Sequence, residues 1–590
     1  MALLQLDSGL LHSAVVHACY ELVKNRETLN AINVFPVADG DTGNNMAATA
    51  KAIITYSSRQ ETLEDTCKSI ADAGILGAHG NSGMIFSQFF NGLTDKITLP
   101  FTLSTREFAS MIANASTSVR AAIANPVEGT ILTVMEAWAA SLQQLAGQVG
   151  CFNQLMKQSI HILDEALQST VNTLSLLKEA NVVDAGALGF TFFVKGFAEF
   201  LNDPRPHVEK ADFPAFEPHH DDEIVSSEPP QMRYCTEAMI AGENLDKSAV
   251  TSLVQAHGDS IVLTANARLC RLHIHCNKPW QVFSALDAAG KIQYPKVDDM
   301  LRQYETLHQR KHPIALVTDT GANIPQDIAD HYQIHFIPFN IQVNGHDLLD
   351  RYGLDSELLY ENLAGLPVYP TTSSPSPGII TEKLRILSRH YEHVLIVSVA
   401  QALSGTHDAI VQATRSFSNV HVINSRHVSG AQGLLLNHAA ELIADGYSIE
   451  AIKEALQAKR SKTHMFVMVN QFDSLIRSGR VSKLKGKIAQ FSQVKPILSL
   501  DPDGRVIIYD KTFSETKALV AMVQAVRDLS QPDGLDNYCI VHAGVPEKAR
   551  EFAIMTTEAF GHEPAFIEPV STGIGLHAGK GCLALAAMTH

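Results

Sequence analysis

Residues 203–230 divide this sequence into two parts with different patterns. The stretch contains six prolines and the acid-rich run EPHHDDEIVSSEPP, with no periodic apolar residues. A segment of this composition cannot bury enough apolar surface to form a core, so we predict a linker over 203–230. Helical spacing dominates before it, whereas strand-like runs begin after it. A chain of 590 residues also exceeds the usual size of one core, so we expect a multidomain protein.

The apolar periodicity predicts three domains. Residues 1–202 are helical nearly throughout, as in REFASMIANASTSVRAAI, and predict an all-α domain. Residues 231–310 combine strand-like runs, SIVLTANA and LCRLHIHC, with one helical pattern and predict a small α+β domain. In residues 311–590 short apolar runs such as PIALVTD and HVLIVSVA alternate with helical stretches. This alternation is typical of an α/β domain with a largely parallel sheet.

Composition and charge exclude several classes of protein. No apolar run reaches the eighteen residues that could span a membrane, and the N-terminus lacks the features of a signal peptide. Eight cysteines without the spacing of a disulfide framework suit a reducing compartment, so we expect a cytoplasmic protein. The net charge of −16 argues against a nucleic-acid partner.

One basic cluster stands apart from this acidic background and comprises Arg477, Arg480, Lys483, Lys485 and Lys487. Two interpretations of it have equal weight. The cluster is either a solvated face or a docking surface for the acidic domain of residues 1–202 or for phosphate groups.

The stretch NVFPVADGDTGNNM places two carboxylates, Asp39 and Asp41, around a glycine just before a helical pattern. Alone, this Asp-Gly-Asp is most often a turn. Three more polar, glycine-containing junctions precede helical patterns, in GAHGNSGMIFSQ, NPVEGTILTV and VVDAGALGF. Unpaired N–H groups and the positive end of the helix dipole favour anions at such junctions, so four of them indicate a phosphate-binding rim.

Carboxylates next to phosphates repel them unless a cation lies between. Magnesium is usually held by one or two carboxylates together with substrate phosphates. The combination therefore predicts a magnesium–nucleotide site.

In their order and spacing these motifs resemble the ATP-binding domain of the dihydroxyacetone-kinase L-subunit type, in the version found in the fatty acid kinase A subunit. The resemblance implies an antiparallel eight-helix barrel that holds ATP and two magnesium ions. Asp39 and Asp41 would be magnesium ligands with a catalytic role, and Asn33 is a less certain third ligand because no acid lies upstream. Phosphate or nucleotide contacts would come from Thr42, Gly43, Asn44, Asn45, Asn81, Ser82, Gly83 and Thr130.

The second domain resembles the middle domain of the same kinase protein, on the stretches YCTE and RLHIHCN. His273 and His275 lie on one face of the predicted strand, and a thiolate from Cys235 would complete three ligands of a structural zinc site. Without the resemblance, a His-x-His pair with a distant cysteine is more often accidental. No fourth protein ligand is evident, and Cys276 is expected on the opposite face.

Seven stretches of residues 311–590 resemble the DegV-type fatty-acid-binding proteins, the B subunits of fatty acid kinase. They are IALVTDTGANIP, PTTSSPSPG, SVAQALSGTHDAI, VINSRHVSGAQG, RSGRVSKLKG, VKPILSLDPDGRV and IGLHAGKGCLALA. The resemblance implies an apolar tunnel for the acyl chain, with the carboxylate held by Thr372, Ser373, Ser404, Gly405 and His577. A buried carboxylate needs several such hydrogen-bond donors to offset its desolvation.

Together the resemblances imply a fusion of a kinase with its lipid carrier, in which ATP phosphorylates a long-chain fatty acid bound by the DegV-like domain. The enzyme would be a phosphotransferase with a carboxyl acceptor, and His577 would also belong to the catalytic set. The acyl phosphate would pass to an acyltransferase of phospholipid synthesis. We expect a homodimer with no transmembrane segment, and transient membrane contact is left open.

Two alternatives stay open on the sequence. A dihydroxyacetone-type kinase would phosphorylate a hydroxyl group, but it requires a partner histidine from a separate K-subunit fold that the sequence lacks. A non-catalytic protein that senses lipid and ATP is disfavoured by the intact pair Asp39 and Asp41.

Overall fold

The computed structural model describes residues 2–35, 40–93, 100–123, 126–203, 229–470, 474 and 494–590. The chain forms two compact units. The first contains Met1–Lys278 and Ala285–Met300, and the second contains Pro279–Ser284 and Leu301–His590. Most of the predicted linker lies outside the described residues, as does the whole basic cluster Arg477, Arg480, Lys483, Lys485 and Lys487. In the part of the chain that is described, no helix is long and apolar enough to cross a membrane.

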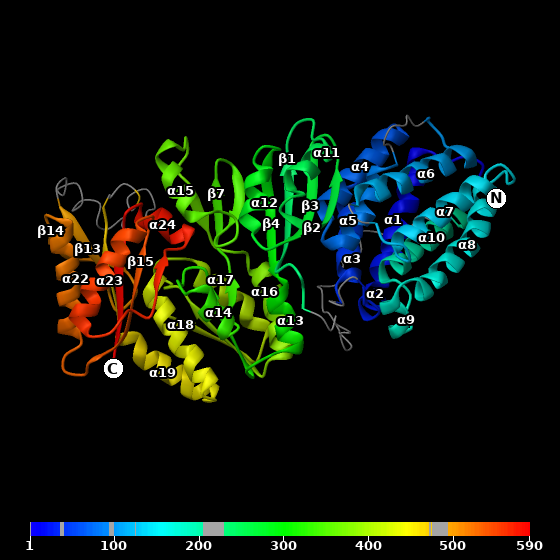
Figure 1. The fold of residues 1–590 in the computed structure, drawn as a ribbon. Helices are drawn as coiled ribbons and strands as arrows, with labels where there is room; N and C mark the ends of the chain where they lie inside the picture. Colours follow the sequence, from blue (N-terminus) through cyan, green and yellow to red (C-terminus); the bar gives the residue numbers. More distant parts are fainter. Residues whose placement is uncertain are drawn as a thin grey trace. The chain divides into compact units, whose positions relative to one another are not determined.

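The first unit begins with an all-helical domain, drawn in blue to cyan in Figure 1. Two of its described helices have only six residues, α2 (Arg26–Ala31) and α9 (Ser175–Ala180). The eight longer ones are α1 (Ser8–Lys24), α3 (Thr42–Tyr56), α4 (Leu63–Gly77), α5 (Gly80–Asn91), α6 (Thr105–Ala122), α7 (Ile131–Leu145), α8 (Phe152–Thr173) and α10 (Ala185–Asn202). The longer helices pack in chain order, and α10 lies against both α1 and α8. The prediction of an all-α domain is confirmed.

Local sequence signals and one aromatic core explain these helices. Ser104 and Glu107 form a reciprocal capping box at the start of α6, which satisfies amide groups that the helix leaves unpaired. Inside the domain, Phe86, Phe90 and Phe193 meet edge to face with ring centroids 5.0 to 5.5 Å apart. Such pairs add to the free energy gained by burying the rings.

A four-stranded antiparallel sheet with order β2-β3-β1-β4 completes the first unit. Its strands are β1 (Tyr234–Ala241), β2 (Gly258–Ala265), β3 (Leu269–Cys276) and β4 (Lys291–Asp299), and the helices in this stretch are α11 (Lys247–Val254) and α12 (Pro279–Leu286). One face of the sheet is apolar, because Ala238, Ile240, Leu272 and Ile274 all point to it and are fully buried. The small α+β domain predicted from the sequence is confirmed.

The other face of this sheet carries polar side chains and lies against the helical domain. Val262 of β2 packs with Ala78 and Met84, which flank the start of α5. Further along α5, Asn91 donates a hydrogen bond of 2.6 Å from its Nδ2 to Oγ1 of Thr264. Helix α5 therefore packs against β2, the neighbour of strand β3, which carries His273 and His275.

In the residues that the structure describes, the second unit has three sheets with helices around them. The first sheet is parallel, with order β11-β10-β5-β6: β5 (Ile314–Asp319), β6 (His335–Ile337), β10 (His393–Ser398) and β11 (Val420–Asn424). The second has order β14-β13-β12-β17-β15-β16: β12 (Thr463–Met468), β13 (Lys495–Leu500), β14 (Val506–Thr512), β15 (Leu535–His542), β16 (Ile567–Pro569) and β17 (Leu583–Thr589). The third comprises β7 (Asn340–Val343), β8 (His346–Leu349) and β9 (Thr371–Ser373).

The second sheet corrects the prediction of a largely parallel sheet. Among its described strands, β15 and β16 pair in parallel, and the other pairs are antiparallel. The apolar runs of this sheet resemble those of buried parallel strands because helices cover it, which is why composition alone misleads. The α/β class itself is confirmed.

Helices cover these sheets, and one helix, α18 (Ser429–Ala444), packs against two of the sheets. They are α14 (Gln326–His331), α15 (Ser356–Asn362), α16 (Pro377–His390), α17 (Thr406–Ala413), α18 (Ser429–Ala444), α19 (Ile449–Ser461), α22 (Glu515–Leu529), α23 (Pro546–Phe560) and α24 (Thr572–Ala578), with short 3₁₀ turns η1 (Leu363–Gly365) and η2 (Thr414–Ser416). Strands of both the first and the second sheet contact α18. Leu434, Leu435 and Leu436 of α18 are all buried, as expected for a helix that is apolar on every side.

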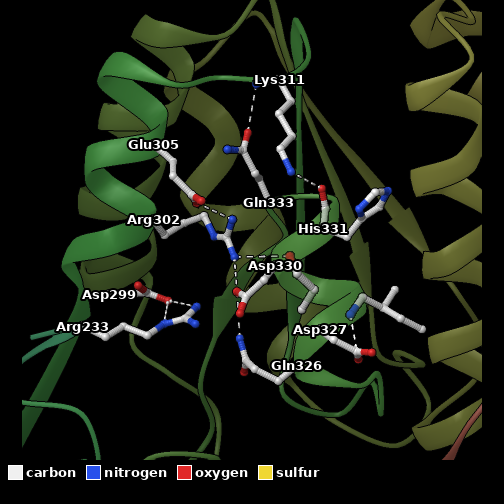
Figure 2. A network of polar contacts seen from close by, with 12 residues as sticks. Arg233, Asp299, Arg302, Glu305, Lys311, Gln326, Asp327, Asp330, His331 and Gln333 are labelled. Atoms are coloured by element: carbon white, nitrogen blue, oxygen red, sulfur yellow. Dashed lines mark hydrogen bonds and ion pairs between the residues drawn. The ribbon is translucent and has the colours of Figure 1, made fainter. Parts of the chain in front are cut away.

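The helix α13 (Met300–His308), which apart from Met300 belongs to the second unit, is held there by a buried arginine (Figure 2). Arg302 is only 3% exposed. Its guanidinium group donates to Glu305 Oε2 at 2.5 Å, to Asp330 Oδ1 at 2.6 Å and to the carbonyl oxygen of Ala329 at 3.3 Å. Gln326 donates to the same Asp330 oxygen at 2.9 Å. These contacts connect α13 with α14 at the edge of the parallel sheet.

We expect Arg302→Ala to lower the free energy of unfolding of the second unit by roughly 2 kcal/mol, because it leaves partly buried carboxylates without their cation. Urea unfolding followed by far-UV circular dichroism measures this loss. Arg415→Ala, at an exposed arginine of the same unit, is the control and should change stability by less than about 0.5 kcal/mol. Equal stability of the two variants would contradict the anchoring role of Arg302.

Candidate functional site

Two of the predicted phosphate-binding junctions meet at the starts of α3 and α5. Asp41 is the N-terminal residue that precedes α3, and its side chain makes no capping hydrogen bond to that helix. The next residue, Thr42, donates from Oγ1 to Asn33 Oδ1 at 3.0 Å and lies 3.2 Å from Oγ of Ser82 in α5. The structure thus brings Asn33, Thr42 and Ser82 together beside Asp41. Asp39 lies outside the described residues.

Glycines allow α3 and α5 to approach each other closely. A side chain at Gly83 would place its Cβ 2.7 Å from the carbonyl oxygen of Asn45, and one at Gly80 would collide with the Asn45 side chain at 2.2 Å. Gly80 also has a φ of +56°, which favours glycine. The predicted residues Gly83 and Asn45 therefore have a packing role in addition to any contact with nucleotide.

Three more of the predicted nucleotide residues, Gly43, Asn44 and Asn81, lie at the same two helix starts. Gly43 packs against the carbonyl oxygen of Arg26, where a Cβ would come within 2.1 Å. Asn44 exchanges hydrogen bonds with Asn30, through its backbone N at 3.1 Å and its side-chain Oδ1 at 3.2 Å. Asn81 lies in the first turn of α5, next to Ser82. All of these residues are thus placed at one rim of the helical domain.

The other two predicted junctions form a second pair, at the starts of α7 and α10. Thr130 caps α7 by accepting a hydrogen bond of 3.4 Å from the backbone N of Leu132. Asp184 caps α10 by accepting one of 2.8 Å from the backbone N of Ala187. Asp184 also accepts a backbone hydrogen bond from Ile131, the first residue of α7. A single buried carboxylate therefore joins two helix starts, and burial raises its pKa to about 6.

The predicted zinc ligands also come together. The strand register places Cys235 opposite His275, and His273 lies two residues away on the same face. The two Nε2 atoms of His273 and His275 are 3.2 Å apart, and one donor atom from each of the three residues lies within 4.8 Å of the others. Cys276 points to the opposite face, where its Sγ lies 3.2 Å from Oγ1 of Thr236. A thiolate and two imidazoles at this spacing suit a tetrahedral zinc ion.

Burial and charged neighbours shift the pKa values of this cluster. Burial, together with the carboxylates of Glu237 and Asp298, raises the pKa of Cys235 well above its usual range, so the thiolate needs a nearby positive charge. Burial lowers the pKa of His275 to about 3, which leaves its imidazole neutral, the form that binds metals. The Nδ1 atoms of His273 and His275 lie 3.2 Å from Glu237 and 4.0 Å from Asp259. The carboxylate at Nδ1 of His273 leaves its Nε2 facing Nε2 of His275, whereas Asp259 lies too far from His275 for a hydrogen bond.

The second unit encloses an apolar cavity of about 230 Å³. The predicted fatty-acid residues all line it, namely Thr372, Ser373, Ser404, Gly405 and His577. Most of the remaining wall is aliphatic and includes Met465, Val467, Leu498 and Val541. The arrangement of a polar group of side chains beside an aliphatic wall is suited to an elongated amphipathic molecule.

The polar side chains of this cavity come from segments far apart in the sequence. Thr372 lies in the short strand β9, and its Oγ1 is 2.9 Å from Nε2 of His577 in α24. Ser404 follows the carboxyl end of β10, where it accepts a hydrogen bond of 3.2 Å from the backbone N of Thr406. Ligands of open parallel sheets commonly bind at the carboxyl ends of the strands.

Buried carboxylates hold both of these segments in place. Asp319, at the end of β5, accepts a hydrogen bond of 2.6 Å from the backbone N of Val399 in the segment that leads to Ser404. Burial raises the pKa of Asp319 to about 6. Asp350 accepts one of 3.1 Å from the backbone N of Gly573 in the first turn of α24. These contacts fix the positions from which Ser404 and His577 face the cavity.

Three family models match consecutive parts of the chain. The model for the DAK2 domain matches residues 36–199, that for the FakA-like middle domain of fatty acid kinase matches residues 231–307, and that for the DegV family matches residues 313–590. The chain combines these three types of domain. The DAK2 domain contains the helix starts described above, the middle domain contains Cys235, His273 and His275, and the DegV domain contains the cavity.

Curated relatives match about half of the chain. An uncharacterized protein of Staphylococcus saprophyticus is 28% identical over 325 residues, and one of Staphylococcus aureus strain COL is 29% identical over 325 residues. Each match covers 52% of this chain and 58% of the relative, so the chain spans less than two thirds of their length.

Solved structures of DegV proteins match the second half of the chain. A fatty-acid-binding DegV protein of Bacillus subtilis is 26% identical with a TM-score of 0.44, covering 47% of this chain and 99% of that one. The fatty acid kinase B3 protein of Streptococcus pneumoniae, loaded with linoleic acid, is 21% identical with a TM-score of 0.41 and the same coverage.

Several residues of these sites were missed by the sequence analysis. Asp184 lies within VVDAGALGF and Glu237 within YCTE, two stretches that the sequence analysis singled out without assigning these residues a role. The strand spacing of Glu237 from Cys235 would have placed both on one face. By contrast, tertiary packing brings Arg271 into contact with both Glu237 and His79. No local signal in the sequence indicates these two contacts.

The raised pKa of Asp184 predicts a pH dependence of stability. Because its pKa is about 6 when folded against a usual 3.8, the folded DAK2 domain holds this proton more tightly than the unfolded chain. Its contribution to stability is therefore present in full below about pH 4 and is lost as the pH rises through about 6. Asp184→Asn should flatten this dependence. Urea unfolding between pH 4 and 7, followed by Trp138 fluorescence in a Trp280→Phe background, measures it.

The exposed carboxylate of Asp65 in the same domain provides the control. Asp65→Asn should keep the pH dependence of the parent protein. If Asp184→Asn keeps it as well, the buried carboxylate is not the source.

Proposed function

We propose that this protein is a fatty acid kinase, which uses ATP to phosphorylate the carboxylate of a long-chain fatty acid held by its own DegV domain. One observation carries the proposal. The chain that contains the DAK2 and middle domains also contains a DegV cavity where polar side chains adjoin an aliphatic wall, with Thr372 and His577 2.9 Å apart. A kinase site and a site for a carboxylate-bearing lipid are thus encoded together.

The cavity has the chemistry that a fatty acid requires. Its aliphatic wall would shelter the acyl chain, with a gain of about 0.8 kcal/mol for each buried methylene before binding costs are subtracted. The hydroxyl groups of Thr372 and Ser404 and the imidazole of His577 would donate hydrogen bonds to the carboxylate. These donors would offset the loss of water around the charged group.

The helix starts of the DAK2 domain suit the phosphates of ATP. Backbone N–H groups at the starts of α3 and α5 and the hydroxyls of Thr42 and Ser82 would bind phosphate oxygens. Asp41, with Asp39 and less certainly Asn33, would hold magnesium, and the resemblance implies two ions. Magnesium supplies charge neutralisation on the γ-phosphoryl group. The hydrogen bond from Thr42 to Asn33 Oδ1 engages the single side-chain oxygen of that third candidate.

The reaction needs positioning more than proton transfer. A carboxylate oxygen of the fatty acid forms a bond to the γ-phosphorus of ATP, the bond to the bridging oxygen breaks, and ADP leaves with that electron pair. Since the carboxylate is already ionised at neutral pH, no general base is required. Thr372, Ser404 and His577 would orient the carboxylate for this in-line attack.

The middle-domain cluster of Cys235, His273 and His275 would hold a structural zinc ion. The product is an acyl phosphate, which is labile and would pass to an acyltransferase of phospholipid synthesis. Fusion of carrier and kinase raises their effective concentration to roughly millimolar if the connection can span the two sites. A cytoplasmic homodimer, in which one chain serves the kinase of the other or its own, fits this scheme.

Asp41→Asn should reduce acyl-phosphate formation by roughly 100-fold or more, because it weakens the proposed magnesium site. The assay follows ADP release with oleate as acceptor, and dihydroxyacetone serves as a second acceptor that tests for a hydroxyl kinase. Bound fatty acid should be unchanged, because the cavity lies in the other unit. Asp65→Asn is the matched control and should retain full activity. Activity near the wild-type level in Asp41→Asn would contradict the assignment of Asp41 as a magnesium ligand.

Protein purified from cells should carry a long-chain fatty acid in its DegV domain. Extraction and mass spectrometry of the wild-type protein detect it. Ser404→Ala or His577→Ala removes one donor to the carboxylate and leaves the aliphatic wall intact, so occupancy should fall only slightly. Kinase activity should fall much further, because the reacting oxygen is then misplaced.

The exposed residue Ser416 provides the control for these variants, and Ser416→Ala should match the wild type in both measurements. The absence of any extracted lipid, together with no binding of added oleate or palmitate, would remove the carrier assignment.

A further inference from the structure

Glu237 is a buried carboxylate at the centre of the middle-domain sheet. It lies on β1 two residues from Cys235, on the same face and opposite His273 of β3. The side chains around it are almost fully buried, with exposed fractions of 1% for Glu237, 2% for Arg271 and 4% for His273. A buried carboxylate is retained only where hydrogen bonds and an opposite charge compensate it.

The partners of Glu237 come from both domains of the first unit. Its Oε1 accepts a hydrogen bond of 2.8 Å from the backbone N of Gly80, the first residue of α5, and lies 3.2 Å from Nδ1 of His273. Its Oε2 lies 3.3 Å from Nη2 of Arg271. The same Nη2 atom donates to Nδ1 of His79 at 2.8 Å. One carboxylate thus contacts a predicted metal ligand and the start of a DAK2 helix.

These contacts fix the orientation of His273. When Nδ1–H of His273 donates to Glu237, its Nε2 carries the lone pair and points to Nε2 of His275, 3.2 Å away. Carboxylates in this position orient metal-binding imidazoles and raise their basicity. Glu237 therefore belongs to the support of the cluster.

The start of α5 is in turn connected to the proposed phosphate site. Two residues beyond Gly80, the hydroxyl of Ser82 lies 3.2 Å from Oγ1 of Thr42. One residue further, the carbonyl oxygen of Gly83 accepts a hydrogen bond of 3.2 Å from Thr49 in α3. A displacement of Gly80 would move these residues relative to α3, because the two helices are closely packed.

We infer that Glu237 is a positioning residue that couples the Cys235–His273–His275 cluster to the first turn of α5. Binding of Zn²⁺ by the cluster holds His273, and through Glu237 it holds the Gly80 amide and the turn that carries Ser82. The functional part of this inference rests on the proposed kinase site, whereas the coupling itself does not.

Coupling of this kind is reciprocal. If zinc stabilises the first turn of α5 and a magnesium–nucleotide binds that turn, each ligand raises the affinity for the other by the same factor. Zinc binding in the middle domain would then raise the nucleotide affinity of the proposed kinase site.

The test uses the full-length protein and needs no turnover. Hydrogen–deuterium exchange is measured for the peptide spanning the start of α5, with zinc bound and after removal by a chelator. Exchange there should rise several-fold on zinc removal, whereas the peptide spanning α11 in the same sheet domain should not change. Equal exchange at α5 with and without zinc would overturn the coupling.

Glu237→Gln tests the residue itself. A glutamine has one acceptor oxygen and an NH₂ group, so it cannot accept from Gly80, His273 and Arg271 together. Zinc affinity should fall roughly 10- to 100-fold, and α5 should exchange faster even at saturating zinc. Glu243→Gln, at an exposed residue just beyond β1, is the control and should match the wild type in both measurements. Wild-type zinc affinity and α5 exchange in Glu237→Gln would refute the assignment.

His79→Ala decides the matter if Glu237→Gln does not fold. It removes a partner of Arg271 from the DAK2 side, and the His79 side chain is 41% exposed, so the domain should tolerate the change. We expect faster exchange at α5 with the zinc content unchanged, and wild-type exchange would count against the coupling. If the wild-type protein shows no kinase activity but hydrogen exchange at α5 still depends on zinc, only the proposed function is overturned.

Discussion

Buried carboxylates that accept hydrogen bonds from backbone N–H groups hold the candidate functional segments of this protein in place. Asp184 joins the starts of α7 and α10, and Glu237 accepts from the start of α5. Asp319 accepts from the segment that carries Ser404, and Asp350 accepts from the helix that carries His577. A carboxylate removed from water must find donors, and the amides of helix starts and loops are the donors that lack partners of their own. This requirement links the interior of each domain to its site.

Buried carboxylates hold different kinds of segment in the two units. In the DAK2 domain the held segments are glycine-containing helix starts, a type of segment that commonly binds phosphates. In the DegV domain they are a loop and a short helix that surround an aliphatic cavity with hydroxyl groups and an imidazole. In the proposed reaction, which joins two ionised substrates without a general base or a covalent intermediate, positioning by such buried groups would align the reacting atoms.

Much of the organisation could be predicted from local pattern. The helical spacing before residue 203 and the mixed pattern after residue 230 indicated the fold classes, because apolar periodicity reflects which side of an element is buried. The parallel sheet was predicted correctly for β5, β10 and β11, whereas the sheet containing β12 and β17 is antiparallel. Strands buried on both faces have the same composition in either case, so pairing direction is set by chain topology.

The sequence by itself determined which residues were candidates for metal binding and phosphate binding. The pairing of His273 with His275 on one face followed from strand spacing, and four helix starts followed from their polar, glycine-containing junctions. The tertiary structure alone decided which of these residues meet. Thr372 reaches His577 across 205 positions and Gly80 reaches Glu237 across 157, and no local pattern encodes such contacts. They arise because packing brings distant segments together and buried polar groups must then find partners among whatever lies nearby.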